Sequence, residues 1–216
     1  MPKLPNDLIA GYGSFRGAIL SRTTETYATL AEHGQKPKTM IISCCDSRVA
    51  PETIFSAGPG ELFIYRNVAN LVPPRDADVE FHGVSAAVEF AVQALKVENI
   101  VVMGHSRCGG VQAALTVDEP DMELSPLSEN NFIGQWIEQL GPAKTKMNFE
   151  DGADFSTRCQ ALEEASVRQS LENLMSFPYI ADHVKNGKLT LHGTWFDVAT
   201  GTLMALDQET GVFFDV

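Results

Sequence analysis

The chain has 216 residues and a mass of 23.5 kDa, which suits one domain with a substantial hydrophobic core. Lys and Arg number 16 against 28 Asp and Glu, so the net charge is −12, and neither nucleic acid nor an anionic membrane surface is an expected partner. No apolar run reaches the roughly 18 residues of a membrane span, and no apolar signal core follows the N-terminus. We therefore expect a cytoplasmic protein in which residues 1–216 form a single domain.

Helical and strand patterns alternate along the first half of the chain. Helical spacing of apolar residues predicts an N-terminal helical arm over about 6–34, although glycines weaken its early turns. Short apolar runs predict buried strands at 39–44, 61–65 and 99–104. A short helix is expected near 50–55, and an amphipathic helix at 84–95 separates the second strand from the third.

The second half of the chain continues this alternation. Helices are predicted at 111–115, 132–140 and 156–175, with loops at 118–128 and 141–152. Residues 189–197 alternate like a strand, and a turn at 199–202 leads back into 203–206. The pattern predicts an α/β fold in which helices flank a central, largely parallel β-sheet, with a long N-terminal helix and a C-terminal antiparallel strand extension.

Two short motifs follow the first and third predicted strands, where ligands gather in parallel sheets. The first reads C-x-D-x-R from Cys44 to Arg48, and the second reads H-x-x-C-G-G from His105 onward, with Cys108 as its cysteine. Two thiolates and one imidazole fit a catalytic zinc site with three protein ligands and one open position. Zinc would balance the charge of the thiolates, and the predicted helix N-terminus after Cys108 favours its thiolate.

Each motif taken alone allows other interpretations. His105 and Cys108 also fit a buried core, and Asp46 with Arg48 also fits a structural ion pair. The five residues that end at Cys108 nearly match a nucleophile elbow, but the glycine required at the last place is missing, which disfavours Ser106 as a nucleophile. A Cys108 nucleophile with His105 as its base stays open, but it leaves the Asp–Arg pair unexplained.

Together with their flanking segments, these motifs resemble the β-class carbonic anhydrases over most of the chain. The likeness is densest at 44–74 and 83–115. The resemblance implies one Zn²⁺ per chain, held by Cys44, His105 and Cys108, with Cys45 as a bystander. It implies the reversible hydration of CO₂ to bicarbonate and a proton by a zinc-bound hydroxide.

The resemblance also implies roles for residues around the metal. Asp46 would orient the nucleophile while Arg48 holds Asp46 in place. Only in a closed state would Asp46 become the fourth zinc ligand. The substrate pocket would consist of one amide donor and three apolar walls, namely Gln35, Phe63, Val68 and Phe90.

One branch of the family shuts its site at lower pH by binding bicarbonate in a Trp–Arg–Tyr pocket. Here Ile41 stands at the tryptophan position and Phe196 at the tyrosine position, so Arg66 lacks both of its partners. A ligand without differential affinity for the shut state cannot shift the equilibrium. We therefore expect an open site at neutral pH, with Asp46 paired to Arg48.

The resemblance implies a homodimer or a higher even-numbered homo-oligomer, with the N-terminal helix laid across a neighbour. CO₂ and bicarbonate are the expected small-molecule partners. Two other functions stay open: a zinc hydrolase of a CO₂ analogue, such as carbon disulfide or carbonyl sulfide, and a non-catalytic zinc-stabilised scaffold. Asp46, Arg48 and Gln35 argue against the scaffold, because a structural zinc site gains nothing from an open position.

Overall fold

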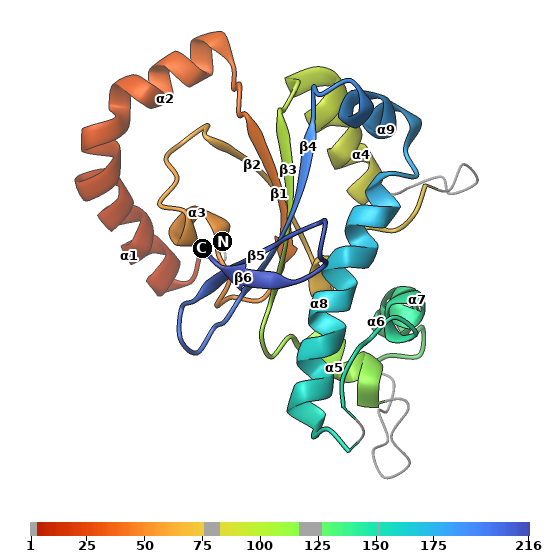
Figure 1. The fold of residues 1–216 in the computed structure, drawn as a ribbon. Helices are drawn as coiled ribbons and strands as arrows, with labels where there is room; N and C mark the ends of the chain where they lie inside the picture. Colours follow the sequence, from red (N-terminus) through yellow and green to blue (C-terminus); the bar gives the residue numbers. More distant parts are fainter. Residues whose placement is uncertain (1–3, 76–82, 117–126, 151) are drawn as a thin grey trace.

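The computed structural model describes residues 4–75, 83–116, 127–150 and 152–216, and a six-stranded sheet forms the centre of this part of the chain (Figure 1). The strands follow the order β2-β1-β3-β4-β5-β6. The first four pair in parallel, and the last two continue the sheet antiparallel. The predicted α/β fold is confirmed. The strand bounds are β1 (Thr39–Cys44), β2 (Leu62–Asn67), β3 (Asn99–His105), β4 (Thr190–Phe196), β5 (Leu203–Leu206) and β6 (Phe213–Asp215).

Helices connect the strands and continue in short π-helical and 3₁₀ stretches. The predicted loop at 141–152 is wrong at its start, because a helical turn begins there at Gly141. The sequence analysis predicted neither the helix that begins at Pro178 nor the last strand. The loop predicted at 118–128 lies largely outside the described residues. The helices are α1 (Asn6–Ser14), α2 (Ser21–His33), α3 (Pro51–Ile54), α4 (Gly83–Glu89), α5 (Gly109–Thr116), α6 (Phe132–Ile137), α7 (Gly141–Lys144), α8 (Phe155–Leu174) and α9 (Pro178–Lys185), with π-helical stretches at Phe15–Leu20 and Phe90–Leu95.

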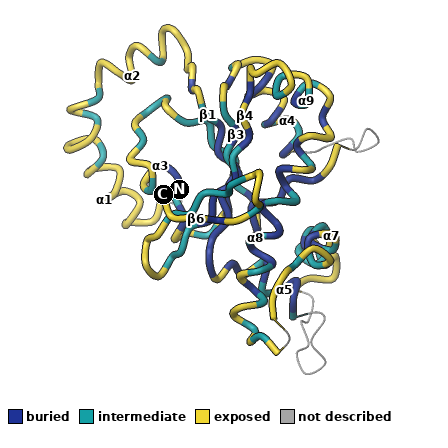
Figure 2. The backbone as a smooth tube through the Cα atoms, viewed as in Figure 1, coloured by how far each residue is buried: buried dark blue, intermediate teal, exposed yellow. Residues whose placement is uncertain are grey.

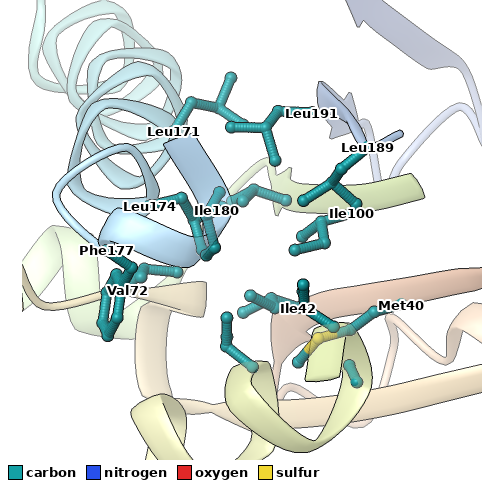
Figure 3. Close-up of a cluster of buried hydrophobic side chains, with 14 of the residues drawn as sticks. Met40, Ile42, Val72, Ile100, Leu171, Leu174, Phe177, Ile180, Leu189 and Leu191 are labelled. Carbon is teal, nitrogen blue, oxygen red and sulfur yellow. The ribbon is translucent and has the colours of Figure 1, made fainter. Parts of the chain in front are cut away.

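One face of the sheet packs against α4, α8 and α9 and forms the largest buried cluster (Figure 3). Ile42 of β1 and Ile100 of β3 share this cluster with Leu174 of α8 and Ile180 of α9, and all four side chains are fully buried. Ile41 points to the opposite face, where it packs in a second cluster. Burial on both faces explains why the central strands are continuous apolar runs.

The N-terminal arm, formed by α1, α2 and the π-helical stretch between them, arches away from the sheet (Figure 1). Neither helix has a buried residue, and Figure 2 draws this segment almost wholly as exposed. Leu8, Tyr12 and Ile19 each expose half or more of their surface. Its apolar side chains are therefore largely uncovered within one chain. Among the described helices, none combines the length and apolarity needed to cross a membrane.

The pairing of β1 with β3 positions the two sequence motifs. Ser43 lies opposite Met103 in the parallel register, so both strands end at the same edge of the sheet. Cys44 is the last residue of β1 and His105 is the last residue of β3, so both lie at this edge. The C-x-D-x-R and H-x-x-C-G-G motifs occupy these positions.

We predict that Leu174→Ala lowers the free energy of unfolding by about 2–5 kcal/mol, because it removes a fully buried side chain and leaves a cavity. Urea unfolding at fixed zinc and protein concentration measures the change. Met175→Ala, at the next residue, is the control, since Met175 exposes 42% of its surface. Equal losses in the two variants would contradict the packing in Figure 3.

Candidate metal centre

Three potential metal ligands converge at the carboxyl edge of β1 and β3. Cys44 is the last residue of β1, His105 is the last residue of β3, and Cys108 stands immediately before α5. One ligand atom from each side chain lies within 4.8 Å of the other two, and all three residues are buried. Within the described residues, no other group of three His, Cys, Asp or Glu side chains has this spacing.

The donor atoms suit a tetrahedral zinc ion. The Sγ atoms of Cys44 and Cys108 lie 4.0 Å apart. Two sulfurs at about 2.3 Å from one tetrahedral ion would be about 3.8 Å apart. The Nδ1 of His105 lies 2.9 Å from the Ser106 carbonyl oxygen, which can only accept, so Nδ1 carries the proton of the neutral ring. Its Nε2 then carries a lone pair and is buried without a hydrogen-bond partner among the described residues, and a metal ion would satisfy it.

Close backbone packing holds the Cys44 sulfur. The backbone N–H of Ala69 donates to Cys44 Sγ at 3.4 Å, and Ala69 has a φ of +64°. A Cβ at Gly110 would lie 2.9 Å from Val68 Cγ1, so glycine there allows α5 to start against this turn. The hydrogen bond between the two sulfurs lowers the pKa of the Cys44 thiol and raises the pKa of the Cys108 thiol, so without a cation only one of them ionises readily.

Asp46 and Arg48 form a two-pronged ion pair beside the ligands. Arg48 Nε donates to Asp46 Oδ1 at 2.9 Å and Nη2 donates to Oδ2 at 2.7 Å. These hydrogen bonds hold the pKa of the Asp46 carboxyl well below its usual range. Arg48 Nη2 also donates to the carbonyl of Arg107 at 3.1 Å. The guanidinium therefore ties the loop of Cys44 to the loop of Cys108.

Arg66 holds the loop that follows Cys44 through two backbone carbonyls. Its Nε donates to the carbonyl oxygen of Cys44 at 2.8 Å, and its Nη2 donates to that of Asp46 at 2.7 Å. Ile41 and Phe196, at the positions of the tryptophan and tyrosine of the shut branch, lie in an apolar cluster on one face of the sheet. The Arg66 guanidinium is therefore engaged with the backbone of the ligand loop.

The four expected substrate residues fall into two places. Val68 directly follows β2, where its neighbour Asn67 pairs with Cys44. Phe63 lies four residues before Asn67 on β2, about 13 Å from it at 3.3 Å per residue. Its ring packs against that of Phe90, with 5.8 Å between the centroids and 39° between the ring planes. Gln35 is exposed and precedes β1, at the end of the strand opposite Cys44. One chain thus brings Val68, but not the other three, to its own metal ligands.

Burial distinguishes the two remaining cysteines. Cys45 is exposed, whereas Cys159 is buried and its pKa is raised to about 11 by burial.

The sequence analysis missed one buried acidic residue near the ligands. Glu163 of α8 is 2% exposed, and burial raises its pKa to about 7. The available signal was its position in an apolar helical stripe with Val167 and Leu174.

Comparisons with known proteins agree with this geometry. The family described as carbonic anhydrase matches residues 39–203. Beta carbonic anhydrase 3 of Arabidopsis thaliana is 36% identical over 205 residues, which cover 93% of this chain and 77% of the relative. The chain belongs to the β-class carbonic anhydrase family. Beta carbonic anhydrase 5, chloroplastic, of the same plant is 41% identical over 80% of this chain, and the match spans 55% of that longer relative.

Solved β-carbonic anhydrases share the fold. The β-carbonic anhydrase CcaA superposes with a TM-score of 0.86 at 28% identity, covering 97% of this chain and 91% of CcaA. A tetrameric β-carbonic anhydrase of Sordaria macrospora gives a TM-score of 0.75 at 27% identity, with 96% of each chain covered. The Cys44, His105 and Cys108 triad is the arrangement typical of a β-carbonic anhydrase zinc site.

We predict that Cys44→Ser, His105→Ala and Cys108→Ser each lose most of the bound zinc, because each removes one of three protein ligands. Zinc per chain, measured by atomic emission after gel filtration, checks this. Cys45→Ser is the matched control, since it alters the exposed neighbour of a ligand and should retain full zinc. Loss of zinc from Cys45→Ser together with its retention in Cys44→Ser would reverse the ligand assignment.

Proposed function

We propose that this protein catalyses the reversible hydration of CO₂ to bicarbonate and a proton. The observation that carries the proposal is the buried triad of Cys44, His105 and Cys108 beside the Asp46–Arg48 pair. Three protein ligands leave one tetrahedral position for chemistry. Zinc, when bound, supplies a nucleophile at neutral pH by lowering the pKa of coordinated water to about 7.

The protein side chains orient the nucleophile, keep the open position clear and line the substrate site. Asp46, kept ionised by Arg48, accepts the hydrogen bond of the nucleophile and aims its lone pair at the substrate carbon. Arg48 keeps the carboxylate on its own guanidinium, so the open position stays clear of Asp46. Val68, 37% exposed beside the ligand turn, supplies an apolar wall suited to CO₂, which has no charge and no net dipole.

The remaining substrate residues act, we propose, from a second copy of the chain. Gln35, Phe63 and Phe90 lie toward the end of the sheet opposite their own triad, and Phe90 is 48% exposed. The uncovered arm offers apolar surface for pairing two copies. This supports a homodimer or a higher even-numbered oligomer, in which Gln35 of one protomer donates its amide to the substrate of the other.

We extend the proposal to the organisation and location of the chain. Residues 1–216 would form one zinc domain that includes the arm at about 6–34. The four free cysteines and the acidic composition support a cytoplasmic location. Fractionation of the native cells would test the location.

Asp46→Asn should keep its zinc but lose CO₂ hydration by about 100-fold or more, because the amide lacks the anionic acceptor and the ion pair with Arg48. Stopped-flow hydration with zinc measured on the same sample checks both parts. Wild-type rates from Asp46→Asn would remove Asp46 from the mechanism. A zinc-loaded wild type that does not hydrate CO₂ would overturn the proposed function. If that protein hydrolyses carbon disulfide or carbonyl sulfide, it is a hydrolase of a CO₂ analogue. If it hydrolyses neither, it is a zinc-stabilised scaffold.

Two inactive variants should complement each other when they share a dimer. A Gln35→Ala chain keeps its own zinc and Asp46, and an Asp46→Asn partner lends it an intact Gln35. Equal mixing by co-expression should restore about a quarter of wild-type activity, because half of the dimers are mixed and each holds one complete site. Sedimentation velocity establishes the dimer. No gain over the separate variants in a confirmed mixed dimer would show that Gln35 does not act across chains.

A further inference from the structure

A buried carboxylate lies behind the metal centre, on the side of Cys108 that faces α8. Glu163 is only 2% exposed, although burying a carboxylate is costly unless its oxygens are satisfied. Its Oε1 accepts the backbone N–H of Cys108 at 3.0 Å, and its Oε2 accepts the indole N–H of Trp195 at 3.1 Å. Both oxygens therefore accept hydrogen bonds from N–H groups, one of which belongs to a residue of the metal-ligand set.

The turn that presents Cys108 requires support. Arg107 has a φ of +57°, a left-handed conformation that residues with a side chain rarely adopt. The direction of the following peptide sets where Cys108 Sγ points. Its N–H is fixed by Glu163, while the carbonyl of Arg107 is fixed by Arg48. The two hydrogen bonds therefore hold the C=O and the N–H of one peptide group, the Arg107–Cys108 amide, from opposite sides.

We propose that Glu163 is a positioning residue for the metal centre. Its carboxylate fixes the Arg107–Cys108 turn and so aims the Cys108 thiolate, while Trp195 fixes the carboxylate. In the structure both oxygens accept hydrogen bonds, which two carboxyl oxygens permit and an amide does not. An amide at this position has one acceptor and one donor, so it would turn an N–H against either Cys108 or Trp195.

This inference rests on the zinc centre of the proposed function but not on the reaction that the centre catalyses. Its test therefore measures metal affinity and the geometry of the metal ligands rather than catalytic activity. The probes are Zn²⁺ affinity by chelator competition, and the thiolate-to-metal charge-transfer and ligand-field bands of the Co²⁺-substituted protein. Partners that orient metal ligands typically change metal affinity by about 10- to 100-fold when removed.

Glu163→Gln should weaken zinc binding by about 10-fold or more and shift the Co²⁺ bands. Trp195→Phe should change both readouts little, because the carboxylate still accepts from Cys108. The double variant should recover most of the affinity and the wild-type bands, since the amide oxygen is then free to face Cys108 with no indole N–H opposing its amino group. Glu164→Gln, at the neighbouring residue that pairs with Arg168, is the matched control and should match wild type.

Wild-type affinity and bands in Glu163→Gln would overturn the inference. A double variant as impaired as the single one would also overturn it, because charge or general packing rather than the acceptor pair would then matter. If Glu163→Gln does not fold by circular dichroism, the folded double variant decides: shifted bands reject the inference and wild-type bands support it. Failure of wild type to bind zinc rejects the centre itself, whereas a zinc-loaded wild type without CO₂ hydration rejects only the proposed reaction.

Discussion

Two cysteine sulfurs 4.0 Å apart in a buried site form the constraint on which the rest of the centre depends. Two thiols this close together and shielded from water cannot both ionise without a nearby cation. Without a metal, one thiol donates a hydrogen bond to the other. A divalent ion held by both sulfurs would remove the repulsion, and His105 Nε2 would be its third protein ligand. The parallel register of β1 and β3 creates this crowding, because it ends both strands at one edge.

The two ligand loops are held by charged side chains acting on backbone groups. Arg48 and Arg66 donate to carbonyls of the loops, while Glu163 accepts an amide N–H. Side chains of both signs are needed because a loop leaving a strand has unpaired carbonyls and unpaired amides. With the backbone fixed in this way, Asp46 keeps its carboxylate on Arg48 rather than near the metal ligands. The open coordination position that we propose would then follow from how the loops are anchored.

The sequence was most informative where local pattern and chemistry coincide. Apolar runs predicted β1 and β3, and the motifs at their ends predicted the triad, because a parallel sheet has only one carboxyl edge. Glu163 was not predicted, since its partner Cys108 lies 55 residues away and only tertiary packing brings α8 to the ligand turn. The helix that begins at Pro178 and the short strand β6 were missed for a related reason: both are short elements whose stability comes from packing on the sheet.

Gln35 illustrates how sequence distance can mislead. Nine residues separate it from Cys44, but β1 is extended and buried, so its two ends face opposite edges of the sheet. No rearrangement of a loop can reverse a central strand that is paired on both sides. The same end of the molecule carries the apolar arm, which lacks buried residues in one chain. The proposed second copy would account for both features, because it would cover the apolar side chains of the arm and place its own triad beside the expected substrate residues. Dimer formation would then be a requirement of the active site as well as of the surface.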